Sequence, residues 1–125
     1  MNDRFKFRVW NKEQNRFHLD ISCDITAHGT LVLSQGIKGK EYIIDDDNYV
    51  IQQCTGLKDK NGKLIYEGDI CKYKFEEIGE QKAIIYFNKE LCSFLAKPLN
   101  DFQYTKINNC EVIGNIYENK ELLNE

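Results

Sequence analysis

Apolar and polar residues alternate along several short stretches of the chain, and a period of two is the pattern of a half-buried β-strand. The first such stretch is residues 4–10. One face of this strand would carry Phe5, Phe7 and Val9, and the other would carry Arg4, Lys6, Arg8 and Trp10. We expect the apolar face of this amino-terminal strand to pack against a core.

Further strand candidates follow at near-regular spacing, some of them alternating and others short apolar or β-rich runs. They predict strands at residues 17–21, 30–33, 41–44, 49–54, 70–75, 83–87, 91–96 and 110–117. Residues 118–123 begin with polar side chains and end with two leucines, which suits one or two turns of helix. Many short strands at this spacing indicate a barrel or a sandwich rather than βαβ units. We therefore predict a mainly β fold, a β-rich α+β protein at most.

The dipeptide Asn61-Gly62 is the strongest turn signal in the chain. Both residue types tolerate positive φ, which a two-residue type I′ hairpin needs at both positions. Gly68 marks a second turn, because it stands just before the alternating stretch 70–75. We expect a hairpin centred on Asn61 and Gly62, and a structural role for all three residues.

No repeat, low-complexity stretch or Gly/Ser-rich linker divides the 125 residues. The softest boundary falls at residues 45–54, which begin with an acidic run. We predict an amino-terminal β unit over residues 1–50 and a small barrel with a carboxy-terminal helical segment over residues 51–125. The alternative is one integrated domain.

Composition changes this picture mainly by what it excludes. Hydrophobic residues make up 42% and charged residues 30% of the chain, which is ordinary for a folded soluble protein and unlike a disordered one. No apolar run approaches the roughly 20 residues of a membrane-spanning helix, and the charged, aromatic start is unlike a signal peptide. We expect a cytoplasmic protein without membrane contact.

The chain contains five cysteines and no Cys-x-x-Cys pair. An odd number of scattered cysteines in a cytoplasmic protein is typical of reduced thiols that pack as small apolar side chains. The thiols expected to be free, mostly buried and without metal are Cys23, Cys54, Cys71, Cys92 and Cys110.

Signals for metal binding or catalysis are weak. His18, Cys23 and His28 lack the paired short spacings of a structural zinc site. The aspartates at 45–47 are consecutive, so their carboxylates diverge instead of converging on one cation. The sequence also contains no phosphate-binding loop, GxSxG elbow or HExxH motif. We expect no enzyme activity, no cofactor, no bound metal and no small-molecule substrate.

The basic face of the amino-terminal strand is the sharpest functional candidate. Alternate residues on one face of a strand lie about 6.6 Å apart, so this face would present a row of cations beside an indole ring. Phosphates would pair with the cations while a nucleobase stacks on the indole. Alternatively, the long side chains cover apolar surface while the indole caps the core, or the face packs against a second subunit. The net charge of −3 favours these two alternatives. The candidate surface consists of Arg4, Lys6, Arg8, Trp10, Lys12 and Arg16.

Three stretches also carry a family resemblance, namely FRVWNKEQNRF at 7–17, TGLKDKNGKLIYEGDI at 55–70 and EVIGNIYENKELL at 111–123. Together they resemble the YopX-like family of small phage and prophage proteins. This resemblance implies a mostly β protein with an SH3-like barrel, encoded by a phage or prophage and present in the bacterial host cell. It implies no activity and no catalytic or binding residue.

Two residues depart from the pattern of that family. Cys71 stands where an aliphatic residue usually follows EGDI, which indicates that its side chain fills the core. Lys120 stands where proline often follows YEN, so the final helical turn lacks its usual proline start.

From the residues and the resemblance, we expect a non-enzymatic phage or prophage accessory protein that acts through protein–protein contacts and self-associates. Its partner would be a second copy of the chain or another host or phage protein. The alternative is a nucleic-acid-binding small β-barrel that uses the basic face of the amino-terminal strand.

Overall fold

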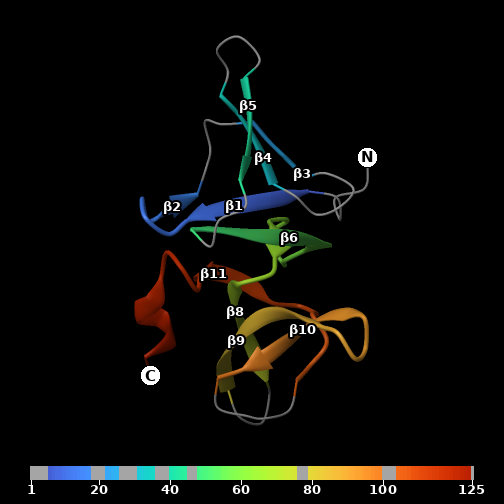
Figure 1. The fold of residues 1–125 in the computed structure, drawn as a ribbon. Coiled ribbons are helices and arrows are strands. Elements are labelled where there is room, and N and C mark those ends of the chain that lie inside the picture. The colour runs from blue at the N-terminus through green and yellow to red at the C-terminus, as the bar shows by residue number, and fades with distance from the viewer. Residues whose placement is uncertain are drawn as a thin grey trace. The chain divides into compact units, whose positions relative to one another are not determined.

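The described part of the chain folds mainly into antiparallel β-strands (Figure 1). The computed structural model describes residues 6–17, 22–25, 31–35, 40–44, 48–75, 79–99 and 104–124, and for 22–25, 31–35, 40–44 and 75 it describes the backbone alone. The elements are β1 (Phe7–Asn11), β2 (Arg16–Phe17), β3 (Ser22–Ile25), β4 (Leu31–Gln35), β5 (Lys40–Ile44), β6 (Tyr49–Lys58), β7 (Leu64–Tyr66), β8 (Asp69–Phe75), β9 (Gly79–Asn88), β10 (Ser93–Pro98), β11 (Glu111–Asn115) and the 3-10 turn η2 (Lys120–Leu123). The predicted mainly β fold is confirmed, and η2 is the only helical element in these ranges.

The strands form three sheets, with the strand orders β2-β1-β6-β7, β10-β9-β8-β11 and β3-β4-β5. Packing divides the chain into two compact units. The amino-terminal unit is Arg8–Ile51. The carboxy-terminal unit combines Met1–Phe7 with Gln52–Glu125.

The amino-terminal unit contains a hairpin and a three-stranded meander. In the hairpin β1 pairs with β2, with Trp10 opposite Phe17, and Asn15 closes the turn with a φ of 56°. Strands β3, β4 and β5 pair in consecutive antiparallel registers. The strands predicted at 30–33 and 41–44 are confirmed as β4 and β5, whereas the hydrophobic pattern did not predict β3. Only Phe17 of the strand predicted at 17–21 lies in β2, and residues 18–21 lie outside the described ranges.

The carboxy-terminal unit is built on the β10-β9-β8-β11 sheet, in which β9 is strongly curved (Figure 1). One face of this sheet forms a core. Its buried members are Ile65, Cys71, Tyr73, Ala83, Ile85, Ala96 and Cys110. Cys71 is fully buried among them, so its predicted role as a core filler is confirmed.

The hairpin predicted at Asn61-Gly62 is present, but it is not of type I′. Gly62 has a φ of 84°, whereas the φ of Asn61 is not positive. The Gly62 N–H donates to the Asp59 carbonyl (3.0 Å) and the Asp59 N–H donates to the Lys63 carbonyl (2.8 Å). The loop therefore has three residues and needs left-handed backbone at its last position only.

The carboxylate of Asp59 organises this loop and ties it to β11. One oxygen accepts from the N–H groups of Asn61 and Lys63, each at 2.9 Å, and the other accepts from the N–H of Val112 at 2.9 Å. Burial alone would raise the pKa of Asp59, but these three hydrogen bonds and the charge of Lys63 outweigh it and hold the pKa below the ordinary value of 3.8.

Gly68 sits where the chain has no room for a side chain. Its φ is 86°, and a Cβ there would collide with the side chain of Gln52. The Gly68 N–H donates to the Ile85 carbonyl (2.8 Å), and its carbonyl accepts from the Ile116 N–H (2.9 Å). Gly68 thus joins three strands or strand ends, and only glycine fits both the backbone conformation and the space.

A buried polar network next to Gly68 anchors the carboxy-terminal end. Asp69 is 1% exposed and accepts from the Tyr66 N–H at 2.8 Å. The Asn115 amide donates to both Asp69 (3.4 Å) and Gln52 (3.3 Å), and the Asn115 N–H donates to the Asn119 side chain (3.1 Å). The chain leading into η2 is therefore held by hydrogen bonds to the sheet.

The last strand departs from the predicted alternation. It spans Glu111–Asn115 rather than 110–117, and its register against β8 shifts between Val112 and Gly114. This irregularity breaks the period of two, because Val112 and Gly114 pair with the adjacent residues Cys71 and Ile70 and therefore lie on opposite faces of the sheet. Val112 packs on the core, and Lys82 Nζ donates to the Leu122 carbonyl at 3.1 Å.

Candidate functional site

The basic surface predicted from the sequence is distributed over both units. Arg4 lies outside the described residues. Lys6 is exposed and belongs to the carboxy-terminal unit. In the amino-terminal unit, Lys12 and Arg16 are exposed, and Arg16 Nε donates to the Gln14 side chain at 3.0 Å.

Trp10 does not present its ring to solvent. The side chain is 2% exposed, and its ring meets Phe17 edge-on, with 4.8 Å between the ring centroids. The guanidinium carbon of Arg8 lies 4.7 Å from the centroid of the same Phe17 ring, a cation–π contact. The indole is therefore buried, as expected in the alternative in which it caps the core, and its ring is not available to stack on a nucleobase. Whether the basic residues bind any partner stays a prediction.

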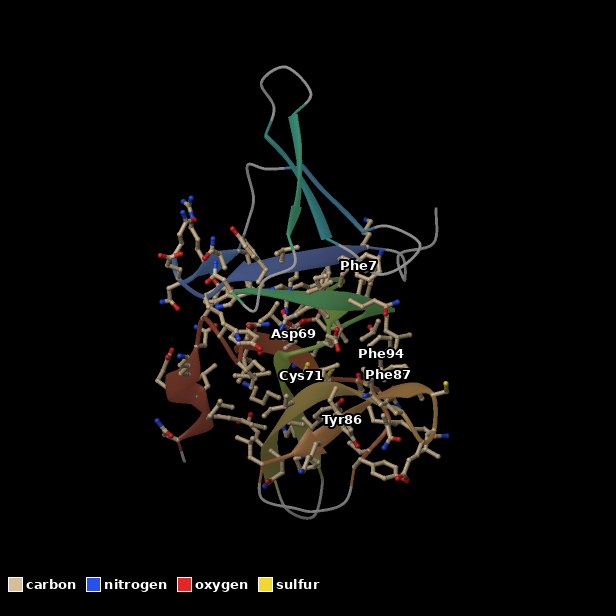
Figure 2. The ribbon with its side chains drawn as sticks, in the orientation of Figure 1. Phe7, Asp69, Cys71, Tyr86, Phe87 and Phe94 are labelled. Atoms are coloured by element: carbon tan, nitrogen blue, oxygen red, sulfur yellow. The ribbon has the colours of Figure 1, made fainter. Side chains whose placement is uncertain are left out.

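A more open surface lies at the tip of the β9–β10 hairpin. Ala83, Ile85 and Phe87 share one face of β9, and their exposed fractions are 0%, 1% and 40%. Phe94 on β10 lies opposite Phe87, and the two rings form an edge-to-face pair with centroids 5.1 Å apart (Figure 2). The sheet face that is buried at Ala83 and Ile85 therefore continues to the tip of the hairpin, where the aromatic pair of Phe87 and Phe94 is partly exposed to solvent.

The facing wall comes from β6, where the strand bulges. The register between β6 and β7 shifts between Cys54 and Lys58, and Gly56 within this stretch has a φ of 84°. Thr55 holds the bulge, because its hydroxyl donates to the Ile65 carbonyl (2.8 Å) and accepts from the Leu57 N–H (3.1 Å). Bulges of this kind redirect side chains next to binding sites, and here Leu57 is left 46% exposed.

Phe7 lies beside β6 but is not among the residues that line the groove described below. The Cys54 N–H donates to the Lys6 carbonyl at 2.9 Å, and β1 runs next to β6. The backbone N–H of Lys12 also donates to the Asn48 carbonyl. These two hydrogen bonds show that β1 and β6 are antiparallel, and this register puts Phe7 opposite Gln53. Phe7 is 40% exposed and shares a face with Gln53.

These walls enclose a groove of about 450 Å³ within the carboxy-terminal unit. This volume lies in the range of sites that bind small molecules or short peptide segments. The lining combines apolar rings with a few groups that can form hydrogen bonds, an arrangement suited to binding. The lining residues are Gln53, Thr55, Leu57, Phe87, Cys92, Ser93 and Phe94.

The sequence did not single out any of these lining residues as functional. The β-rich runs at 83–87 and 91–96 predicted that Phe87 and Phe94 lie on strands, but they do not indicate which residues of a sheet face stay exposed. The three turn residues that it did single out, Asn61, Gly62 and Gly68, have structural roles outside the groove.

The cysteines of the carboxy-terminal unit fall into two environments. Cys54, Cys71 and Cys110 are free and buried, whereas Cys92 at the rim of the groove is free and exposed. Cys71 donates a hydrogen bond to the sulfur of Cys110, and this bond, with burial, raises the pKa of Cys71. Burial likewise raises the pKa of Tyr73, so the buried group is protonated at neutral pH.

The described residues show no metal centre of the usual kind. Within these ranges no three His, Cys, Asp or Glu side chains are grouped to hold a metal ion. His18, His28 and the aspartates at 45–47 lie outside the described residues, and only the backbone of Cys23 is described. The described part of the chain also contains no helix with the length and apolar character needed to cross a membrane.

Comparison with known proteins places the chain in a family. The YopX protein family model matches residues 6–124, so the chain belongs to the YopX family. Protein EF1440 from Enterococcus faecalis has a similar crystal structure, with 28% identity, a TM-score of 0.61, and coverage of 94% of this chain and 96% of that one. The crystal structure of protein yopX from Bacillus subtilis is similar in fold, with 23% identity, a TM-score of 0.70 and 98% coverage of both chains. A comparison with curated proteins gave no match.

Proposed function

We propose that this YopX-family chain is a non-enzymatic accessory protein of a phage or prophage, and that it acts in the bacterial cytoplasm by binding another protein at the groove of the carboxy-terminal unit. The phage origin rests on the family resemblance. The partner is a host or phage protein or, in a self-associating form, a second copy. We also propose that the carboxy-terminal unit is an SH3-like barrel, which its short, curved, antiparallel strands support.

The observation that carries this proposal is the exposure of inward-facing apolar side chains. Phe87 continues the buried face of Ala83 and Ile85 but is 40% exposed, and Leu57 across the groove is 46% exposed. Burying a Leu or Phe side chain fully is worth about 1.5–3 kcal/mol. A partner that covers these residues would gain part of that free energy, which the isolated chain leaves unused.

The alternative of nucleic-acid binding has less support. Stacking of a base requires an accessible aromatic face, whereas Trp10 is 2% exposed and Phe17 is covered by Arg8. The net charge of −3 also gives no general attraction to phosphates.

Photo-crosslinking in bacterial cells tests the proposal. A benzoylphenylalanine at position 87 should give one discrete adduct, which mass spectrometry identifies, and Leu57→Ser should abolish it. The matched control places the same probe at Tyr104, which is 51% exposed and outside the groove lining. An adduct that forms equally from both positions, or that persists in Leu57→Ser, would contradict the proposal.

A further inference from the structure

Strand β10 is an edge strand, and its register shows which backbone groups point outward. In the sheet order β10-β9-β8-β11, β9 is the one named strand among the described residues that pairs with β10. On the other side, Ala96 exchanges both hydrogen bonds with Thr105, at 2.9 Å and 2.8 Å. Ala96 therefore directs its N–H and carbonyl away from β9, and so do the residues two positions away along the strand.

Phe94 is such a residue, and within the described ranges its backbone N–H has no hydrogen-bond partner. The β9–β10 register is uninterrupted from Ser93 to Pro98, so the N–H and carbonyl of Phe94 point outward, as those of Ala96 do. Thr105 belongs to an isolated bridge that ends before it reaches Phe94. Among the described residues no hydrogen bond reaches the Phe94 N–H, and its carbonyl receives only a long bond of 3.4 Å from the Ser93 hydroxyl.

The free edge and the groove meet at the same residue. Phe94 contributes to the lining of the groove, and its backbone belongs to the part of the β10 edge that no described residue pairs with. We infer that the groove binds an extended segment of a partner protein, which pairs with β10 at Phe94 and places an apolar side chain between Leu57, Phe87 and Phe94. This inference rests on the proposed function and specifies the form of its partner.

The size of the groove decides between a peptide segment and a second folded copy. A stable interface between folded proteins buries about 800 Å² and about 20–30 residues on each side. The groove has seven lining residues and a volume of about 450 Å³. A site of this size accommodates a few residues of an extended chain, and strand addition gains affinity from main-chain hydrogen bonds as well as from the pocket.

The outward backbone groups decide between a peptide and a small apolar molecule. A small apolar molecule offers no hydrogen-bond partner to the Phe94 N–H and carbonyl, whereas a strand supplies a carbonyl and an N–H at the right spacing. Because strand side chains alternate, the bound segment should carry an apolar residue facing the groove with its two neighbours directed away. We expect that residue to be Leu, Met or Phe.

The probe is a peptide selected for binding to the protein from a displayed library of random linear 12-residue peptides. We expect the selected peptides to carry an apolar residue that faces the groove, flanked on each side by a residue directed away from it. Leu57→Ser should weaken binding of this peptide by about tenfold or more, and Tyr104→Ser should change it by less than about twofold. Phe87→Ser provides a second groove variant in case one variant is poorly folded.

Two measurements on the bound peptide test strand addition itself. Single N-methylation along the peptide should abolish binding at alternate positions only, because every second N–H faces β10. Hydrogen exchange at the Phe94 amide should slow by at least about tenfold on saturation, since the amide gains a partner.

The outcomes separate this inference from the proposed function. If N-methylation shows no alternation, or if the Phe94 amide stays unprotected, the segment does not add as a strand and the inference is overturned, although Leu57→Ser still abolishes the cellular adduct. A concentration-dependent dimer that Leu57→Ser dissociates would assign the groove to a second copy and also overturn it. If Leu57→Ser affects neither the peptide nor the adduct, the proposed function fails as well.

Discussion

The two ends of the β9–β10 hairpin share one sheet face but differ in what covers it. Near Ala83 and Ala96 the face is fully buried, and the neighbouring turns are fixed by Gly68 and by the carboxylate of Asp59. Near Phe87 the same face is open. The difference shows how one continuous face can supply folding free energy at one end and leave apolar surface for a partner at the other.

Gly68→Ala should give the largest loss of stability, because it disrupts the closed end. The substitution places a Cβ against Gln52 and requires a non-glycine residue at a φ of 86°. We expect the free energy of unfolding in urea to fall by more than about 2 kcal/mol. Gly62→Ala is the matched control, since it has a φ of 84° and open space around it. Equal losses for both variants would show that the packing around Gly68 is not tight.

Asp59→Ala should come next, because it leaves three backbone N–H groups without their acceptor. We expect a loss of about 1–3 kcal/mol, measured by urea unfolding at pH 7. Asp59→Asn provides an uncharged comparison of similar shape.

The same carboxylate predicts a pH dependence. The pKa of Asp59 is lower in the folded protein than its unfolded value of 3.8. The contribution of the charged carboxylate to the free energy of unfolding is therefore complete above pH 3.8 and is lost as the pH falls through the folded pKa. The wild type should therefore lose more stability than Asp59→Asn when the pH is lowered from about 5 to about 2. If the free energies of unfolding of the two proteins fall in parallel with pH, the charge of Asp59 does not stabilise the fold.

Gly62→Val should have a smaller effect than Gly68→Ala, although valine is larger. It needs positive φ from a β-branched residue but meets no atom within 4 Å of the added Cβ. We expect a loss of more than about 1 kcal/mol in thermal or urea unfolding. An unchanged melting temperature would mean that the loop does not need a left-handed residue.

Thiol labelling should separate the two ends without changing stability. In a Cys23→Ser background, Cys92 should react with a thiol reagent in the folded protein, and Cys54, Cys71 and Cys110 should react only after unfolding. Cys92→Ser should remove the fast phase. Fast labelling of two or more sites in the folded protein would show that the closed end opens readily.

The sequence predicted the strands better than their environment. Alternation located β8, and short apolar runs located β4 and β5, because both patterns are typical of side chains that a strand buries. The sequence left open whether Trp10 is exposed or caps the core, because burial of the indole involves residues such as Phe17 across the hairpin. It assigned the wrong turn type at Asn61, because the Asp59 carboxylate supports a three-residue loop instead. The sequence did not predict the groove, because its lining combines residues of the bulged strand β6 with residues of the β9–β10 hairpin, which is distant in sequence.

Leu57→Ser and Ile85→Val together test whether the open end of the sheet face binds a partner independently of stability. Both the free energy of unfolding and the yield of the photo-adduct at position 87 are measured for each variant. We predict that Leu57→Ser abolishes the adduct while stability falls by less than about 1 kcal/mol, because Leu57 is 46% exposed. Ile85→Val, at a position 1% exposed, should lower stability by about 0.5–1.5 kcal/mol and keep the adduct. If the adduct yield instead follows the free energy of unfolding in both variants, the open end has no binding role of its own, which contradicts the proposal that the groove binds a partner protein.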